Sequence, residues 1–248
     1  IGTGHVMRCM SLATSLKEIG ANCLFICREH EGNLISYIRN NNFETIALKN
    51  QNKTYLENKS KRSLAHEHWL GIDWKTDATE TISAFTSTPL DWLVVDHYGL
   101  DARWESKLRP YTKNILIVDD LADRMHDCDI ILDQNLGRKI SDYSNLISEK
   151  TLKLIGPQYA PLRPEFLLSR KTVLAKREIS KLDKIFIFMG GMDKNNITNK
   201  VLTSLSKCNN LSLSKIFVLI GPNSPWQRNI EEQKDNKAVP IKLNIGPQ

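Results

Sequence analysis

The chain has 248 residues and a net charge of +6, with 41% hydrophobic and 25% charged residues. This composition is typical of a soluble globular protein with enough apolar residues for one large core or two modest ones. No apolar run approaches the roughly 20 residues that span a bilayer, so we expect no membrane segment. Basic residues are scattered rather than grouped with aromatics, which disfavours nucleic-acid binding and favours an anionic small molecule as partner.

The five cysteines, at positions 9, 23, 27, 128 and 208, are odd in number and have no Cys-x-x-Cys spacing. We therefore expect reduced thiols in a cytoplasmic protein, without a disulfide framework or a zinc site. No group of Asp, Glu and His has convincing metal-ligand spacing, so neither a metal nor a cofactor is expected. Oligomeric state is left open by the sequence.

The first half of the chain alternates helical patterns with short apolar runs. Helices are expected at 6–19, 33–40, 64–85 and 103–109, with a loop over 49–61 and strands at 22–27, 43–48, 91–96, 115–118, 129–132 and 152–155. Continuous apolar strands separated by helices indicate a parallel sheet covered on both faces. The sequence thus predicts a doubly wound, Rossmann-like α/β domain over residues 1–155.

A second alternation follows a Pro-rich segment. A charged helix is expected over 163–181, then strands at 184–189 and 216–220 and helices at 197–205 and 226–232. We therefore predict a second Rossmann-like domain over residues 156–248. Because a Gly-rich turn usually follows a buried strand and none precedes Ile1, we expect the sequence to be a fragment that lacks its first strand. The second domain is likewise expected to be incomplete.

Ligands of open parallel sheets bind beyond the carboxyl ends of the strands, which selects a small set of turns. The first is Gly2–His5, which we expect to be a loop before a helix that begins at about Val6. Gly2 and Gly4 permit close approach of a ligand, and the helix N-terminus favours an anion. A neutral imidazole at His5 can act as a base, and Arg8 can pair with a phosphate or a carboxylate. The alternative is a tight turn beside a surface histidine.

The next candidate turn is Asp96-His97-Tyr98, after the most hydrophobic strand. Tyr98 is expected to contact substrate, and Asp96 or His97 to orient neighbours or bind substrate. A histidine packed at the domain edge is an equal alternative for His97. Asn135, which follows the strand at 129–132, is a further candidate substrate ligand.

Asp119 and Asp120 are adjacent residues at one strand end, so their side chains should point in opposite directions. One is expected to cap the next turn and the other to contact a ligand.

Gly190 and Gly191 lie between a strand and a helix in the second domain, as expected of an anion-binding turn. Asp193 is a candidate either for binding a nucleotide diphosphate or, like Asn195, for capping the helix. Together with Gly2–His5 on the first domain, this turn predicts a ligand held in a cleft between two sheets.

The order of these motifs resembles the PseG family of UDP-sugar hydrolases of pseudaminic acid biosynthesis, which are relatives of the GT-B glycosyltransferase MurG. The matching motifs are IGTGHVMR (1–8), VDHYG (95–99), VDD (118–120), CDIIL (128–132), GPQYAPLRPEF (156–166) and MGGMD (189–193). The resemblance implies a GT-B fold, with two Rossmann-like domains facing a cleft and the second truncated here. It also implies hydrolysis of UDP-2,4-diacetamido-2,4,6-trideoxy-β-L-altropyranose to UDP and the free sugar.

In that family the histidine of the Gly-x-Gly-His loop activates water, which maps onto His5, and the tyrosine near the substrate maps onto Tyr98. The C-terminal domain of the family binds UDP, which is consistent with Gly190 and Gly191. UDP is a good leaving group, so one base can replace the usual carboxylate pair, with inversion and without a metal. Two alternatives stay open: a GT-B glycosyltransferase with a UDP-sugar donor, and a non-catalytic nucleotide-sugar binding module.

Overall fold

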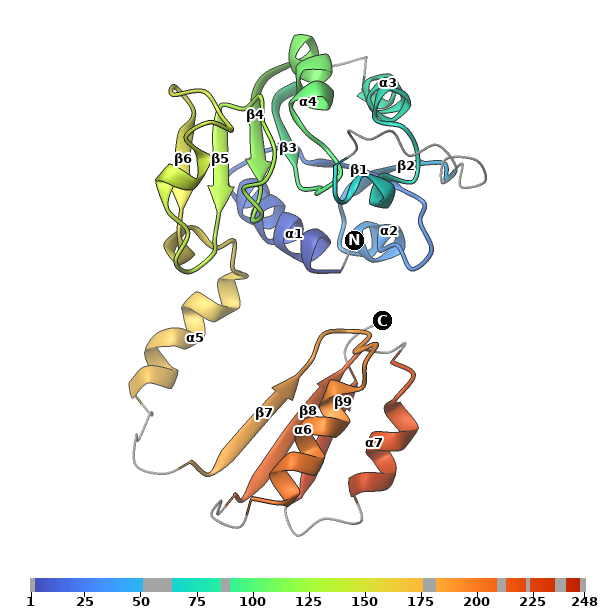
Figure 1. Ribbon diagram of the computed structural model, residues 1–248, viewed down its shortest axis with the longest axis vertical. Coiled ribbons are helices and arrows are strands. Elements are labelled where there is room, and N and C mark those ends of the chain that lie inside the picture. Colours follow the sequence, from blue (N-terminus) through green and yellow to red (C-terminus); the bar gives the residue numbers. More distant parts are fainter. Residues whose placement is uncertain are drawn as a thin grey trace. The chain divides into compact units, whose positions relative to one another are not determined.

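Figure 1 shows the computed structural model of the chain. The structure describes residues 3–50, 64–85, 90–175, 182–208, 213–221, 224–234 and 240–245. The chain divides into two compact units, residues 1–169 and residues 170–248. Each unit is described by itself.

Unit 1 alternates helices and strands along the chain, as the apolar runs predict. Its strands are β1 (Leu24–Arg28), β2 (Glu44–Leu48), β3 (Leu90–Val95), β4 (Thr112–Val118), β5 (Ile130–Asp133) and β6 (Leu152–Ile155). Its helices are α1 (Thr3–Glu18), α2 (Ile35–Asn40), α3 (Trp74–Phe85) and α4 (Ala102–Leu108), with short 3-10 turns η2 (Glu67–Leu70), η3 (Arg109–Tyr111), η4 (Ile140–Tyr143) and η5 (Pro157–Tyr159).

All strand pairs described in unit 1 are parallel. β1 pairs with β2, and a four-stranded sheet has the order β3-β4-β5-β6. Alternate residues of the central strands, such as Ile115, Ile117 and Ile131, are at most 1% exposed and form the core with Trp104 and Leu108. Because these strands are parallel, their carboxyl ends share one edge of the sheet, where polar residues follow.

A buried ion pair ties β1 to the helices. Arg28 donates to one carboxylate oxygen of Asp77, with its NH2 nitrogen at 2.6 Å, and the Trp104 indole donates to the other oxygen at 2.9 Å. Both charged side chains are less than 10% exposed. The pairing fixes the end of β1 against α3 and α4, since a buried charge without its partner is costly.

Unit 2 has the parallel sheet β7-β8-β9, with strands β7 (Lys184–Phe188), β8 (Lys215–Ile220) and β9 (Ile241–Ile245). Leu202 of α6 (Ile197–Ser206) and Ile230 of α7 (Gln227–Lys234) are fully buried and pack with Val218 of the central strand. The helix α5 (Pro164–Ala175) contains the boundary between the units, and none of its side chains is buried.

The predicted α/β class with parallel sheets is confirmed, and every predicted strand is present within a few residues. The GT-B arrangement of two domains facing a cleft stays a prediction. Strand β9 was not predicted, because Lys242 and Asn244 interrupt its apolar run. Of the predicted loop and the predicted charged helix, residues 51–61 and 176–181 lie outside the described residues.

The single helix predicted over 64–85 is instead η2 followed by α3, because Gly71, with a φ of 75°, ends η2. Two boundaries also differ from expectation. Helix α1 begins at Thr3 rather than at about Val6, so Gly4 and His5 lie in its first turn and not in a loop. The compact units divide after Ser169 rather than after Ile155. The second difference has a local cause, because the turn after β6 is bonded to unit 1: the N–H of Gly156 donates to the carbonyl of Asp133 at 2.7 Å.

Among the described residues, no helix combines the length and the apolar character needed to cross a membrane.

Candidate active site

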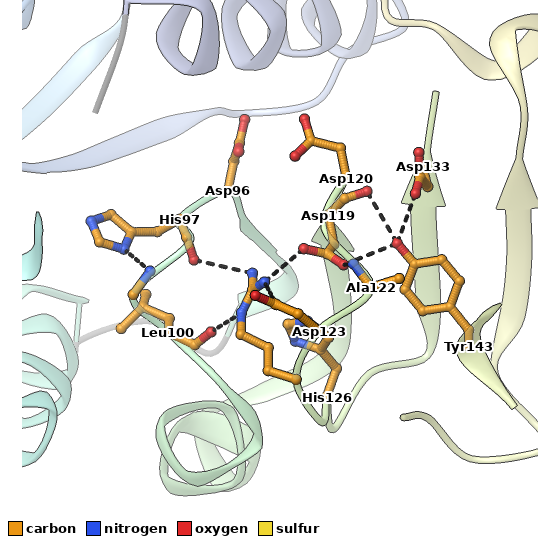
Figure 2. Close-up of polar contacts among 12 residues, drawn as sticks. Asp96, His97, Leu100, Asp119, Asp120, Ala122, Asp123, His126, Asp133 and Tyr143 are labelled. Carbon is orange, nitrogen blue, oxygen red and sulfur yellow. Dashed lines mark hydrogen bonds and ion pairs between the residues drawn. The ribbon is translucent and has the colours of Figure 1, made fainter. Parts of the chain in front are cut away.

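The first turn of α1 meets the ends of β3 and β4 at the polar edge of the unit 1 sheet. Figure 2 shows Asp96 and Asp120 extending from these strand ends on the same side. From α1, His5 bonds to Asp96, and Arg8, one helical turn further on, bonds to both aspartates. Residues distant in the chain thus form one charged cluster, as the strand-end rule predicts.

His5 forms a short hydrogen bond with Asp96. Its Nδ1 lies 2.6 Å from Oδ1 of Asp96, and the two side chains are 12% and 3% exposed. An ionised carboxylate can only accept, so we assign the proton of this bond to Nδ1 of the histidine; the 2.6 Å contact is shorter than the 3.1 Å approach of Arg8 NH2 to the same nitrogen. The neutral ring then carries its lone pair on Nε2, the nitrogen that can take a proton from another molecule.

Arg8 is shared between two carboxylates. Its Nε and NH2 nitrogens donate to the two oxygens of Asp96, each at 2.6 Å, and its NH1 nitrogen donates to Asp120 at 2.9 Å. Burial alone would lower the pKa of Arg8, but hydrogen bonds and charges from Asp96 and Asp120 raise it above the ordinary value. The guanidinium thus pairs with carboxylates in this structure, which is one of the two pairings expected from the sequence.

Asp96 is therefore the centre of the cluster. Burial would raise its pKa, yet hydrogen bonds from Arg8 and His5 hold the pKa below the usual range for aspartate. The thiol of Cys9 also donates to it, at 3.4 Å. Both carboxylate oxygens of Asp96 are therefore bonded to side chains of α1.

His97 fixes the turn that follows β3. Its Nδ1 accepts a hydrogen bond from the N–H of Gly99 at 2.9 Å, as drawn in Figure 2. Burial, and next the electrostatic interaction with the neighbouring His5, lower the pKa of His97 to about 3. This ring is neutral and positions the turn, which agrees with the alternative of a histidine packed at the domain edge.

Tyr98 lies beside His5, with ring centroids 4.6 Å apart and the rings nearly perpendicular. Burial, and next a hydrogen bond to Asp120, raise the pKa of Tyr98 to about 12, so its hydroxyl keeps its proton at neutral pH. Two further rings, His66 and Trp69, approach Tyr98 at 5.7 and 5.8 Å. The sequence reasoning missed these two residues, because they lie in η2 and its preceding turn and not at a strand end.

Asp119 points away from Asp120, as the adjacent strand-end positions predict. Its Oδ2 accepts from the N–H of Ala122 at 2.9 Å, which caps the next turn, and its Oδ1 accepts from Arg124 at 2.8 Å. The Tyr143 hydroxyl lies 2.9 Å from both Asp119 and Asp133 (Figure 2). This fully buried network joins the ends of β4 and β5 beneath the site.

Asn135, a candidate substrate ligand from the sequence, bonds to the backbone of Asp120 in this structure. Its side-chain amide donates to the backbone carbonyl of Asp120 at 3.0 Å, and Arg138 donates to the same oxygen at 2.7 Å. Arg138 also donates to the buried carboxylate of Asp133 at 2.6 Å. The loop after β5 therefore fixes the residue to which Arg8 and Tyr98 bond.

The second candidate site is the turn after β7 in unit 2. Gly190 has a φ of 82°, and a Cβ atom added at Gly190 or Gly191 would meet nothing within 4 Å. Asp193 is 9% exposed, and its carboxylate accepts from the N–H groups of Ile197 and Thr198, each at 2.8 Å. Asp193 thus caps α6, while the two glycines leave an open backbone approach.

Gly4 is helical, and a Cβ atom there would also meet nothing within 4 Å. A ligand could therefore approach the first turn of α1 closely. Gly2, the other glycine of the predicted loop, lies outside the described residues. Across the part of the chain that the structure describes, no cluster of three or more His, Cys, Asp or Glu could hold a metal ion.

Fold and site together define a parallel α/β protein with a carboxylate-oriented histidine at the carboxyl edge of its sheet. No family model matches the chain. Among curated proteins, it is 27% identical over 214 residues to the UDP-2,4-diacetamido-2,4,6-trideoxy-beta-L-altropyranose hydrolase of Campylobacter jejuni. The aligned segment covers 86% of this chain and 65% of the hydrolase. The chain is also 23% identical over 248 residues to an uncharacterized protein of Methanocaldococcus jannaschii, which covers 98% of this chain and 45% of that protein.

The chain therefore spans less than two thirds of the length of either relative, and it is a distant relative of a UDP-sugar hydrolase.

Proposed function

We propose that the protein hydrolyses a UDP-linked diacetamido-trideoxy sugar to UDP and the free sugar, in pseudaminic acid biosynthesis. The 2.6 Å hydrogen bond between His5 Nδ1 and Asp96 Oδ1 carries the proposal, because it leaves Nε2 of His5 as the base. The distant similarity to the Campylobacter jejuni hydrolase supports the choice of substrate.

In the proposed mechanism, His5 Nε2 takes a proton from a water molecule as that water attacks the anomeric carbon. The bond from this carbon to the UDP oxygen breaks with inversion, and UDP leaves with the bonding electron pair. Asp96 keeps the Nδ1–H tautomer and stabilises the imidazolium that forms. Tyr98, whose ring lies beside His5 and whose hydroxyl keeps its proton, contacts the sugar.

We further propose that unit 2 binds UDP at the Gly190–Gly191 turn. Backbone N–H groups of a glycine turn before a helix can cradle phosphates. Because the carboxylate of Asp193 is already bonded to the first turn of α6, the proposal gives Asp193 the role of fixing this turn and not that of a UDP ligand.

The test is to incubate the protein with the UDP-sugar in heavy-oxygen water containing EDTA, because the mechanism needs no metal. We expect UDP and the free sugar to form without any acceptor, with the label in the sugar and not in UDP. Turnover that requires an added acceptor would instead favour the glycosyltransferase alternative.

The matched variant is His5→Asn, which removes the base and keeps a polar side chain. We expect turnover to fall at least about 10²-fold, as for loss of a general base, while the affinity for UDP stays unchanged. Activity equal to that of the wild type would contradict the role of His5. If wild type and variant both bind the UDP-sugar without any turnover, the protein is a non-catalytic binding module.

A further inference from the structure

We propose that Trp69, His66 and Tyr98 form an aromatic platform that packs against the sugar of the substrate and favours sugars with methyl-bearing substituents. Here the aromatic platform means these three rings. The inference rests on the proposed function, which supplies a nucleotide sugar as the ligand, and it assigns the specificity for the sugar to residues outside the catalytic motif.

The three rings form one continuous cluster. The ring centroids of His66 and Trp69 lie 4.5 Å apart. The centroid of Tyr98 lies 5.7 Å from that of His66 and 5.8 Å from that of Trp69. All three residues are half-buried rather than part of the fully buried core. Partly exposed aromatic rings that converge beside a polar centre are typical of a small-molecule site.

The position of the aromatic platform indicates that it contacts the sugar and not the nucleotide of the substrate. Tyr98 contacts the ring of His5 at a centroid distance of 4.6 Å, and His5 is the proposed base at the anomeric carbon. A group that touches Tyr98 and Trp69 therefore belongs to the ring that carries this carbon. The uracil base is separated from it by two phosphates and a ribose.

Several polar groups beside the aromatic platform are bonded to neighbouring residues. Both oxygens of Asp96 accept from Arg8, and Nδ1 of His97 accepts from the backbone of Gly99. Asp120 accepts from Arg8 and from Tyr98. Deoxy and N-acetyl methyl groups gain by covering such aromatic rings.

Gly99 holds the aromatic platform in place. A Cβ atom at this residue would lie 2.9 Å from the backbone carbonyl oxygen of His66 and 3.0 Å from the ring of His97. The turn that carries His66 and Trp69 can therefore approach the loop after β3 only if residue 99 has no side chain. Gly99→Ala offers a way to displace the platform without removing a ring.

The test measures equilibrium binding in a His5→Asn background, where the substrate persists. The probes are UDP-2,4-diacetamido-2,4,6-trideoxy-β-L-altropyranose, UDP-N-acetylglucosamine and UDP. For Trp69→Leu we expect affinity for the diacetamido sugar to fall about 10-fold or more, with a smaller loss for UDP-N-acetylglucosamine and none for UDP. Trp69→Phe should retain most of the affinity, and Gly99→Ala should show the same selective loss as Trp69→Leu.

The matched control is Trp92→Leu, because Trp92 is 46% exposed in the first half of β3, away from the carboxyl edge. It should leave all three affinities unchanged. Equal losses for UDP and the UDP-sugars, no loss in Trp69→Leu, or a wild type that binds none of the probes would overturn the platform. Selective loss in a protein whose wild type never releases sugar would uphold the platform and refute the hydrolase.

Discussion

The carboxylate of Asp96 decides which nitrogen of His5 can act as a base. In Asp96→Asn the side-chain amide can donate to Nδ1, which moves the imidazole proton to Nε2 and blocks proton abstraction. We expect kcat/KM to fall about 10³-fold or more, with a smaller change in UDP affinity, because a wrong tautomer impairs the chemical step. Steady-state kinetics with the UDP-sugar, together with UDP titrations, measure both quantities.

Asp91 provides the control on the same strand. Its carboxylate is 77% exposed and pairs with Lys113 at the other end of β3. Asp91→Asn should keep full activity, since exposed ion pairs contribute little. The orienting role of Asp96 is wrong if Asp96→Asn folds normally and retains the kcat/KM of the wild type.

Helix α6 depends on an aspartate that the sequence also suggested as a UDP ligand. Asp193 accepts two N–H groups of the first turn of α6, so Asp193→Ala should destabilise unit 2 by about 1 kcal/mol, as for loss of an N-terminal cap. Urea unfolding measures this loss. Asn195→Ala, at an exposed neighbour, should leave stability unchanged. A large loss of UDP affinity without loss of stability would instead show Asp193 to be a UDP ligand.

The strands, and the edge of the sheet that holds the site, could be predicted from the sequence, because short apolar runs such as 115–118 indicate buried strands. Parallel pairing then brings Asp96 and Asp120 together, and alternation of side chains separates Asp119 from Asp120. The predicted start of α1 was wrong because the glycines were interpreted as a turn signal, although Gly4 is helical.

Contacts between segments distant in the sequence could not be predicted. Trp69 and Tyr98 are joined by packing of η2 on the loop after β3, for which a single sequence contains no periodic signal. The partners of Arg8 could not be predicted either, because Asp96 and Asp120 follow two strands far along the chain. Local sequence patterns therefore predicted which edge of the sheet holds the site, but not the side-chain contacts within it.

Mild acid should lower the stability of unit 1 and not that of unit 2. All six histidines lie within residues 1–169, at positions 5, 30, 66, 68, 97 and 126. Burial lowers the pKa of His97 from 6.5 to about 3, so between these values the unfolded chain binds more protons than the folded one. Stability from His97 is complete above pH 6.5 and is lost as the pH falls towards 3.

From pH 7 to pH 5 we expect unit 1 to lose about 2 kcal/mol through His97, at about 1.4 kcal/mol for each pH unit below 6.5. Urea unfolding at both pH values, with pulse hydrogen exchange to resolve β3–β6 from β7–β9, measures each unit. In His97→Asn the amide oxygen can still accept from Gly99, and the loss through His97 should disappear, which leaves the loss through His30, whose pKa burial also lowers. This difference also separates His97 from Glu105, whose pKa burial raises and which acts in the opposite direction. Equal pH dependence in wild type and His97→Asn, or an equal loss in unit 2, would contradict the prediction.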